Sequence, residues 1–267
     1  MRPYYEANGI TVWLGDCLDV LPTLDAVDHV ITDPPYARDV YVRMGAWDRA
    51  HTSEREAGRS IPGGTIGDAL SVMAAGDIGS IDDMRLPVAV NIARVTRRWA
   101  LVFSDVETAH LWRRDLETGM RYVRTGAWVK PDPMPQMSGD RPGVGFEPCT
   151  ITHAKGAMRW NGGGHPAVWT HGRSKGADRP NHPCPKPLPL MAELVALFTD
   201  PGDLILDPFM GSGTTLVAAK QLGRRAIGIE LEEKWAEAAV KRLESTTPPL
   251  FVVPSEKPTQ SEMEVPA

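Results

Sequence analysis

The 267-residue chain is predicted to form an α/β fold in which helices cover both faces of a doubly wound, mostly parallel sheet. Short apolar runs alternate with longer segments whose apolar residues repeat at helical spacing. Three of the apolar runs end in acidic or glycine-rich turns, and open parallel sheets bind their ligands beyond such strand ends. The length suits one large domain with an insertion, or two small domains.

The elements are assigned in order from β-branched and aromatic runs for strands and from apolar spacing for helices. Strands are expected at 10–14, 28–32, 99–103, 122–129, 203–207 and 225–230. Helices are expected at 81–98, 108–118, 188–198, 214–222 and 232–243, with a short helix or turn at 17–24. Pro34 stops the second strand because proline offers no N–H to a sheet, and Gly119 stops a helix.

The remaining segments are irregular in pattern. Residues 37–80 contain several glycines and are expected to be an inserted loop region. Pro and Gly are dense from 131 to 181, which predicts a loop-rich region outside the core. The Pro-rich tail at 246–267 is expected to be mobile. Residues 1–130 and 182–245 then form the main domain.

Charge is distributed unevenly along the chain. The net charge of -5 argues weakly against a polyanionic partner. Residues 121–186, however, hold 10 Lys and Arg against 4 Asp and Glu, a net charge of +6, which indicates either a nucleic-acid surface or a solvated basic face. No apolar run reaches the roughly 20 residues of a membrane helix. Three widely spaced cysteines and the lack of a signal segment predict a cytoplasmic protein.

The stretch LILDPFMGSGTTLVAAKQLGRRAIGIE predicts a strand, a glycine turn, a helix, a second strand and a terminal acid. Gly211 and Gly213 allow a tight turn that a ligand can approach closely. Glu230 ends the second strand, where a carboxylate can accept hydrogen bonds from two ribose hydroxyls. The lysine of a P-loop and the third glycine of a dinucleotide fingerprint are both missing. The pattern favours a nucleoside ligand over a plain turn.

The stretch VITDPPY ends a strand with Asp33, Pro34, Pro35 and Tyr36. The Asp33 carboxylate and the rigid Pro34 carbonyl can accept both hydrogens of an exocyclic amino group, while Tyr36 stacks on its ring. Accepting both hydrogens makes the amino nitrogen more nucleophilic. Asp-Pro-Pro is also a common turn, so these four residues alone leave both interpretations open.

Several motifs together carry a family resemblance. GDC at 15–17, VITDPPY at 30–36, HPCPKP at 182–187 and LDPFMGSGTT at 206–215 resemble the DNA amino-methyltransferases. These enzymes use S-adenosylmethionine to methylate adenine N6 or cytosine N4. Segments 128–135 and 145–149 are also similar to that family. DPPY precedes the glycine loop here, an order that resembles the permuted β-group.

The resemblance implies a seven-stranded, circularly permuted methyltransferase sheet of the Rossmann-like type, with the main domain as the catalytic domain. Asp33, Pro34, Pro35 and Tyr36 are the implied catalytic residues, which hold a flipped base. The implied S-adenosylmethionine-binding residues are Asp16, Cys17, Lys186, Asp207, Phe209, Gly211, Ser212, Gly213, Thr214 and Glu230. No metal is implied, and the spacing of His and Cys does not favour zinc.

Double-stranded DNA is the implied partner, with 131–181 as its target-recognition region. No membrane partner is implied, and the frequent dimers of the family allow a homodimer. The expected DNA contacts are Arg38, Arg43, Lys130, Lys155, Arg159, Arg173, Lys175 and Arg179.

The target base follows from the residue before Pro-Pro. In the family this residue is more often Asp for adenine and Ser for cytosine, so Asp33 favours adenine N6. Cytosine N4 is the alternative, since both bases present the same N–C=N amino edge. Motif order disfavours an RNA or protein methyltransferase. The intact Asp33, Tyr36 and Gly211 disfavour a DNA-binding relic without catalytic activity.

Overall fold

The computed structural model describes residues 2–36, 81, 83–133, 142–174, 185–247 and 249. The predicted loop insertion at 37–80 and almost all of the tail lie outside these residues. The strands are β1 (Tyr5–Ala7), β2 (Ile10–Leu14), β3 (His29–Thr32), β4 (Trp99–Phe103), β5 (Arg121–Val129), β6 (Phe146–His153), β7 (Val168–Thr170), β8 (Leu204–Asp207) and β9 (Arg225–Glu230). The helices are α1 (Cys17–Val20), a short 3-10 turn (Leu21–Thr23), α4 (Arg85–Val95), α5 (Ala109–Leu116), α6 (Leu188–Phe198), α7 (Thr214–Gln221) and α8 (Glu233–Ser245).

All nine described strands belong to one sheet in the order β1-β2-β9-β8-β3-β4-β6-β5-β7. The central run from β2 through β9, β8 and β3 to β4 is parallel. β6 runs antiparallel to β4 and β5, and β1 runs antiparallel to β2. The predicted mostly parallel α/β sheet is confirmed. The described sheet has two strands more than predicted, because the three-residue strands β1 and β7 extend its two edges.

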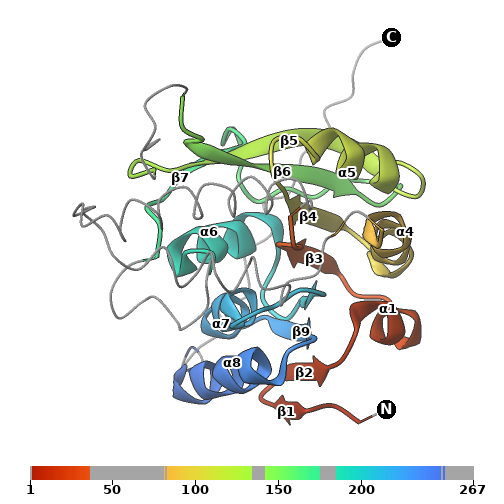
Figure 1. Ribbon diagram of the computed structural model, residues 1–267, viewed down its shortest axis with the longest axis vertical. Helices are drawn as coiled ribbons and strands as arrows, with labels where there is room; N and C mark the ends of the chain where they lie inside the picture. Colours follow the sequence, from red (N-terminus) through yellow and green to blue (C-terminus); the bar gives the residue numbers. More distant parts are fainter. Residues whose placement is uncertain are drawn as a thin grey trace, which may run out of the picture.

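Two apolar cores fill the two faces of the sheet. Along β4, Leu101 and Phe103 belong to one core and Ala100 and Val102 to the other, as the two-residue alternation of a strand requires. Helices α6, α7 and α8 pack on the first core, and α1, α4 and α5 pack on the second. Figure 1 shows α6, α7 and α8 on one side of the central strands and α1 and α4 on the other. The sheet is therefore doubly wound, as predicted.

The expectation that 131–181 lies outside the core is wrong for β6 (Phe146–His153). This strand lies between β4 and β5, and its residues from Pro148 to His153 are buried. Pro148 argues against a central strand, because proline removes a donor from the ladder. Its flanks are rich in Gly and Pro, which hid the β-branched run behind it. Trp169 on β7 is also buried.

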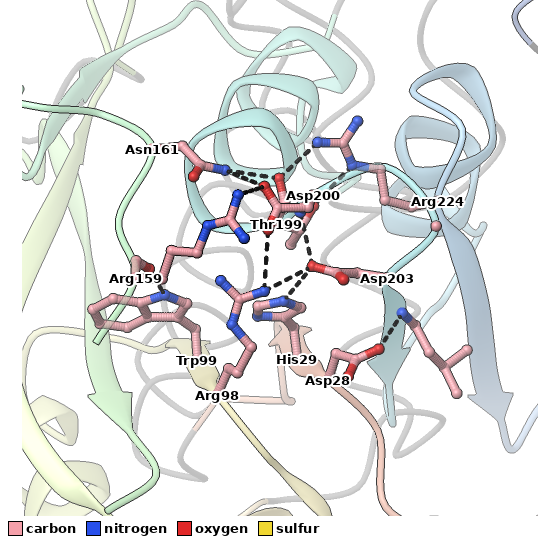
Figure 2. A network of polar contacts seen from close by, with 12 residues as sticks. Asp28, His29, Arg98, Trp99, Arg159, Asn161, Thr199, Asp200, Asp203 and Arg224 are labelled. Atoms are coloured by element: carbon pink, nitrogen blue, oxygen red, sulfur yellow. Dashed lines mark hydrogen bonds and ion pairs between the residues drawn. The ribbon is translucent and has the colours of Figure 1, made fainter. Parts of the chain in front are cut away.

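A polar network ties together the starts of the central strands (Figure 2). His29, at the start of β3, lies with its Nε2 2.9 Å from Asp203 Oδ2, and Arg98 donates to the same oxygen at 3.0 Å. The backbone N–H of Asp200 donates to it at 2.7 Å. Burial lowers the pKa of His29, which keeps its ring neutral. Burial opposes the charge of Asp203, yet the hydrogen bonds from His29 and Asp200 lower the pKa of its carboxyl. Ion pairs and hydrogen bonds therefore hold the starts of β3, β4 and β8 together at the amino-terminal rim of the sheet.

Among the helices within the described ranges, none combines the length and the apolar character needed to cross a membrane.

Replacing Asp203 should destabilise the fold. Asp203→Asn removes a negative charge that serves His29, Arg98 and a backbone N–H, so the free energy of unfolding should fall by about 1–3 kcal/mol. Asp25→Asn, at an exposed position, should change it by less than about 0.5 kcal/mol. Urea denaturation of both variants is the measurement. Equal stabilities would show that the network contributes nothing.

Candidate active site

The three acidic or glycine-rich strand ends noted in the sequence lie along one rim of the sheet. β2, β9, β8 and β3 are parallel neighbours, so their carboxyl ends lie along the same edge of the sheet. Gly15 follows β2 and donates its N–H to the carbonyl of Glu230, at the end of β9, at 2.9 Å. Asp207 ends β8, and Asp33 follows β3. The motifs are far apart in the sequence, and the parallel register brings them together.

Asp207 fixes the start of the glycine loop from inside the protein. Its carboxylate accepts hydrogen bonds from the Thr32 hydroxyl at 2.7 Å, the Thr215 hydroxyl at 2.5 Å and the Phe209 N–H at 3.1 Å. Burial raises the pKa of Asp207 to about 6, although these bonds favour the charged form. Asp207 thus joins β3, β8 and α7 beneath the loop.

The glycine loop needs its two glycines for different reasons. Gly211 has a φ of 52° and Gly213 a φ of 76°, in the left-handed region that favours glycine. The Gly211 N–H donates to Glu230 Oε2 at 3.0 Å, and Glu232 N–H donates to Oε1 at 2.8 Å. A Cβ on Gly213 would lie 2.8 Å from the Cβ of Ala239 on α8. Gly211 shapes the turn beside Glu230, while Gly213 allows α7 to approach α8.

Ser212 and Thr214 hold the loop to α8. Arg242 donates to the Ser212 carbonyl at 2.5 Å and to the Thr214 hydroxyl at 3.1 Å. Both residues are buried. Arg242 was not predicted from the sequence, and neither charge nor spacing distinguishes it from other helical arginines. The contacts of these two residues indicate loop positioning by α8.

Asp16 and Cys17 lie at the end of β2, next to Glu230. The Asp16 side chain accepts from the Leu18 N–H at 2.8 Å and caps α1. One carboxylate oxygen therefore has a structural partner at the rim. Cys17 is buried in the core of α1 and α4, and burial raises the pKa of its thiol to about 12. Its contribution to the site is packing by a neutral thiol.

Asp33 belongs to a cluster of four charges. The Lys186 ammonium group contacts Asp33 Oδ2 and lies 2.9 Å from Glu147 Oε2. Lys130 Nζ donates to the other Glu147 oxygen, Oε1, at 2.5 Å. The Lys186 side chain is 9% exposed, whereas that of Asp33 is 25% exposed and can be reached from outside. Asp33 Oδ1 is buried and has no hydrogen-bond partner within the described part of the chain.

Aromatic rings surround the Lys186 ammonium group. Its nitrogen lies 5.0 Å from the centroid of the Phe103 ring, 5.7 Å from that of Trp128 and 5.8 Å from that of Tyr36. Such distances allow cation–π attraction, which favours the charged form of lysine in a partly dry site. Lys186 therefore contacts the implied catalytic residues Asp33 and Tyr36, a position that the sequence had linked with the cofactor.

The pKa shifts show how the cluster distributes its charge. Burial raises the pKa of Asp33 in spite of Lys186. Burial also opposes the ionisation of Glu147, but Lys186 and Lys130 outweigh it and lower its pKa to about 2. The two carboxylates likewise outweigh burial and raise the pKa of Lys186. Glu147 is thus a fixed anion, while Asp33 is the carboxylate closest to taking up a proton.

Glu147 is the clearest functional candidate missing from the predicted site. The segment 145–149 was noted for its resemblance, but no role followed from it. The sequence could have suggested that Glu147 pairs with a cation, because a glutamate within a buried apolar run is rarely found without one. The identity of that cation required the pairing of β6 with β4 and β5, which no local pattern encodes.

The predicted DNA contacts separate into groups. Arg38, Arg43, Lys175 and Arg179 lie outside the described residues. Lys130 is engaged by Glu147, and Arg173 donates its Nε–H to the Asp132 carbonyl at 3.0 Å near the carboxyl-terminal rim. Lys155 and Arg159 follow the end of β6, which runs antiparallel to β4 and so ends at the opposite rim. Arg159 lies there 3.2 Å from Asp200 and appears in Figure 2. The structure does not bring Lys155 and Arg159 to the site.

The sequence matches a known family over most of its length. Residues 27–241 match the profile of the N6/N4 methyltransferases, a DNA methylase family. The chain belongs to this family and is a DNA methyltransferase. It is 31% identical over 240 residues to YubD of Escherichia coli strain K12, named as a methylase, covering 86% of this chain and 88% of that protein. It is 25% identical over 292 residues to the type II methyltransferase M2.DpnII of Streptococcus pneumoniae, covering 91% and 93%.

Solved structures share the fold. The PvuII DNA methyltransferase, cytosine-N4-specific, has a TM-score of 0.67 at 16% identity, covering 90% of this chain and 88% of that one. The complex of M1.HpyAVI with SAM has a TM-score of 0.61 at 24% identity, covering 88% and 98%. At these identities the likeness concerns the architecture, and it agrees with a Rossmann-like methyltransferase sheet.

Adding a methyl group at Gly213 should disturb the glycine loop. Gly213→Ala combines a φ of 76° with a contact of 2.8 Å to the Cβ of Ala239, so it should destabilise the protein by about 1–3 kcal/mol. Gly164→Ala is the matched control, because its Cβ would meet nothing within 4 Å and its φ is ordinary. Thermal denaturation compares the two. A Gly213→Ala protein as stable as the control would contradict this packing.

Proposed function

We propose that this DNA methyltransferase transfers a methyl group to the N6 amino group of adenine in double-stranded DNA. The observation that carries the proposal is Asp33 Oδ1, a buried carboxylate oxygen without a partner among the described residues. Buried acceptors normally have donors, so an unpaired one in a reachable side chain indicates a ligand that donates a hydrogen bond. The amino group of a base is such a donor, and the Tyr36 ring lies near the Lys186 ammonium group that contacts Asp33.

The residues at the glycine loop fit S-adenosylmethionine as the methyl donor. Gly211 carries no side chain where the loop turns beside Glu230, so a ligand can approach its backbone. Each Glu230 oxygen accepts one backbone N–H and retains capacity for a ribose hydroxyl. Asp16, Phe209, Gly211 and Glu230 are the residues we expect to hold the cofactor. When bound, it supplies an electrophilic methyl group whose departure leaves a neutral thioether.

Asp33 serves as a hydrogen-bond acceptor for the incoming amino group. A stacked base cannot reach the carboxylate, so the target nucleotide leaves the duplex at a cost of a few kcal/mol. Asp33 Oδ1 and the Pro34 carbonyl then accept the two amino hydrogens, which directs the nitrogen lone pair away from them. The nitrogen needs to lose its proton only as its new bond to carbon forms. A strong base is therefore unnecessary, and positioning supplies up to roughly 7–11 kcal/mol of the rate enhancement.

The choice of base rests on one side chain. Asp33 carries a charge that pairs with an amino group becoming positive, and the resemblance associates this residue with adenine. Cytosine N4 is the second candidate, because the PvuII enzyme that shares this fold is named as cytosine-N4-specific. Both bases donate through the same amino edge, so the acceptor chemistry of Asp33 suits either one.

Removing the Asp33 carboxylate should abolish catalysis without abolishing cofactor binding. Asp33→Ala should lower kcat for transfer from tritiated S-adenosylmethionine to DNA by at least about 100-fold, because a polar contact made to the reacting nitrogen is lost. Calorimetry should still detect S-adenosylmethionine binding. Asp25→Ala, far from the rim in an exposed position, should keep full activity. Normal kcat in Asp33→Ala at saturating cofactor would reject the assigned role.

The target base can be identified directly. DNA from a host without its own methylases, after expression of this protein, should yield N6-methyladenine on digestion and mass analysis. An Asp33→Ala culture is the control and should yield none. Finding N4-methylcytosine would reverse the choice of base while keeping the chemistry. Finding neither base from folded, cofactor-binding protein would overturn the proposed DNA activity.

A further inference from the structure

Lys186, Glu147 and Lys130 form a row of alternating charges that ends at Asp33. The four groups come from different parts of the fold: Asp33 follows β3, Lys186 precedes α6, Glu147 lies on β6 and Lys130 follows β5. Lys186 contacts Asp33 Oδ2 and lies 2.9 Å from Glu147 Oε2, while Lys130 holds Glu147 Oε1 at 2.5 Å. The two positive and two negative charges balance within the cluster.

The sharing of Lys186 has a consequence for Asp33. A buried aspartate facing a lysine alone forms a closed ion pair, which keeps the acid ionised but occupies its oxygens. An ammonium group can donate a hydrogen bond to one carboxylate and form an ion pair with a second, as Lys186 does with Asp33 Oδ2 and Glu147 Oε2. Here it uses only Oδ2 of Asp33, and Oδ1 stays open. The aromatic rings of Phe103, Trp128 and Tyr36 limit the movement of the ammonium group.

We propose that Glu147 is a positioning residue that shares the Lys186 ammonium group with Asp33, so that Lys186 keeps Asp33 ionised and leaves Oδ1 open to the amino group of the base. Lys130 supports this arrangement by holding the other oxygen of Glu147. The inference rests on the role of Asp33 proposed above. The proposal adds Lys130 after β5, Glu147 on β6 and Lys186 before α6 to the four residues of the DPPY motif.

The charges around Asp33 act on it in opposite directions. Lys186 and Lys130 favour its ionised form, and Glu147 disfavours it. From β8, Asp207 faces it with a carboxylate occupied by Thr32 and Thr215. Cys149 on β6 is a buried neutral thiol whose pKa is raised by burial. Tyr36 lies beside Lys186. Because burial raises the pKa of Asp33, the acceptor is lost as pH falls through that raised value, and activity falls with it.

The pH dependence of kcat/KM tests the proposal. Methyl transfer to DNA from a methylase-free host is measured with tritiated S-adenosylmethionine across the acid and neutral range. In Glu147→Gln the repulsion between the two carboxylates disappears, so the acid limb, the fall of kcat/KM at low pH, should move to lower pH. KM for DNA should rise, because Lys186 then pairs with Asp33 alone. In Lys186→Gln the acid limb should move to higher pH by about one unit or more. A purely structural role would lower activity without moving the limb in opposite directions.

Charge-conserving and distant variants complete the experiment. Glu147→Asp keeps the charge and should keep the acid limb near that of the wild type. Glu117→Gln removes a glutamate from an exposed ion pair with Arg113 and should leave the profile unchanged. Circular dichroism and S-adenosylmethionine binding show which variants fold. If Glu147→Gln does not fold, Glu147→Met replaces it and should also move the limb to lower pH, since the same negative charge is lost.

The outcomes separate the two proposals. Wild-type protein that transfers no methyl group to DNA would overturn the proposed function. Active wild-type protein whose acid limb stays in place in both Lys186→Gln and Glu147→Gln, or moves in the same direction in both, would overturn the shared-lysine arrangement alone.

Discussion

The partly buried ion pair between Lys186 and Asp33 is the contact on which the arrangement of the site depends. It joins the end of β3 to the chain that enters α6, two segments that are remote in sequence. Charges removed from water are costly unless partners and hydrogen bonds compensate them. Glu147 and Lys130 provide that compensation, and the four groups together keep a carboxylate in a partly dry position. An ionised carboxylate can remain there because its neighbours supply the stabilisation that water would otherwise give.

The two rims of the sheet differ in how fully their polar side chains are paired. At the amino-terminal rim, the Asp203 carboxylate is contacted by His29, Arg98 and the backbone N–H of Asp200, and these three contacts link β3, β4 and β8. At the carboxyl-terminal rim, Asp33 keeps an oxygen without a partner among the described residues, and Gly211 takes a backbone conformation that favours glycine. Unpaired acceptors and unusual backbone are tolerated when the rest of the structure is well determined. The well-paired amino-terminal rim helps the fold to tolerate the unpaired oxygen and the unusual backbone at the carboxyl-terminal rim.

Local sequence predicted most of the parallel half of the fold. β4 and β9 have the predicted bounds. β4 is buried along its whole length, and β9 is a short run with β-branched residues that ends at Glu230. β6 was missed since Pro148 and its glycine-rich flanks resemble a loop, although tertiary pairing places it inside the sheet between β4 and β5. The role of a charge was harder still. The positive charges of Lys155 and Arg159 suggested DNA contacts. The antiparallel direction of β6 places both residues at the amino-terminal rim of the parallel strands, away from the site. The role proposed for Glu147 depends on Lys130 and Lys186, which the neighbouring segments place beside it.

The order of the strands also has a consequence for synthesis. β2 pairs with β9, and β3 pairs with β8, so strands from the first 32 residues of the sequence need partners beyond residue 203. A nascent chain emerging from the ribosome has the DPPY turn early but lacks the glycine loop, Glu230 and α8 until synthesis is nearly complete. Closing such long intervals is entropically costly and slows folding. The segments that carry the proposed base-binding and cofactor-binding residues therefore come together only when the chain is nearly complete.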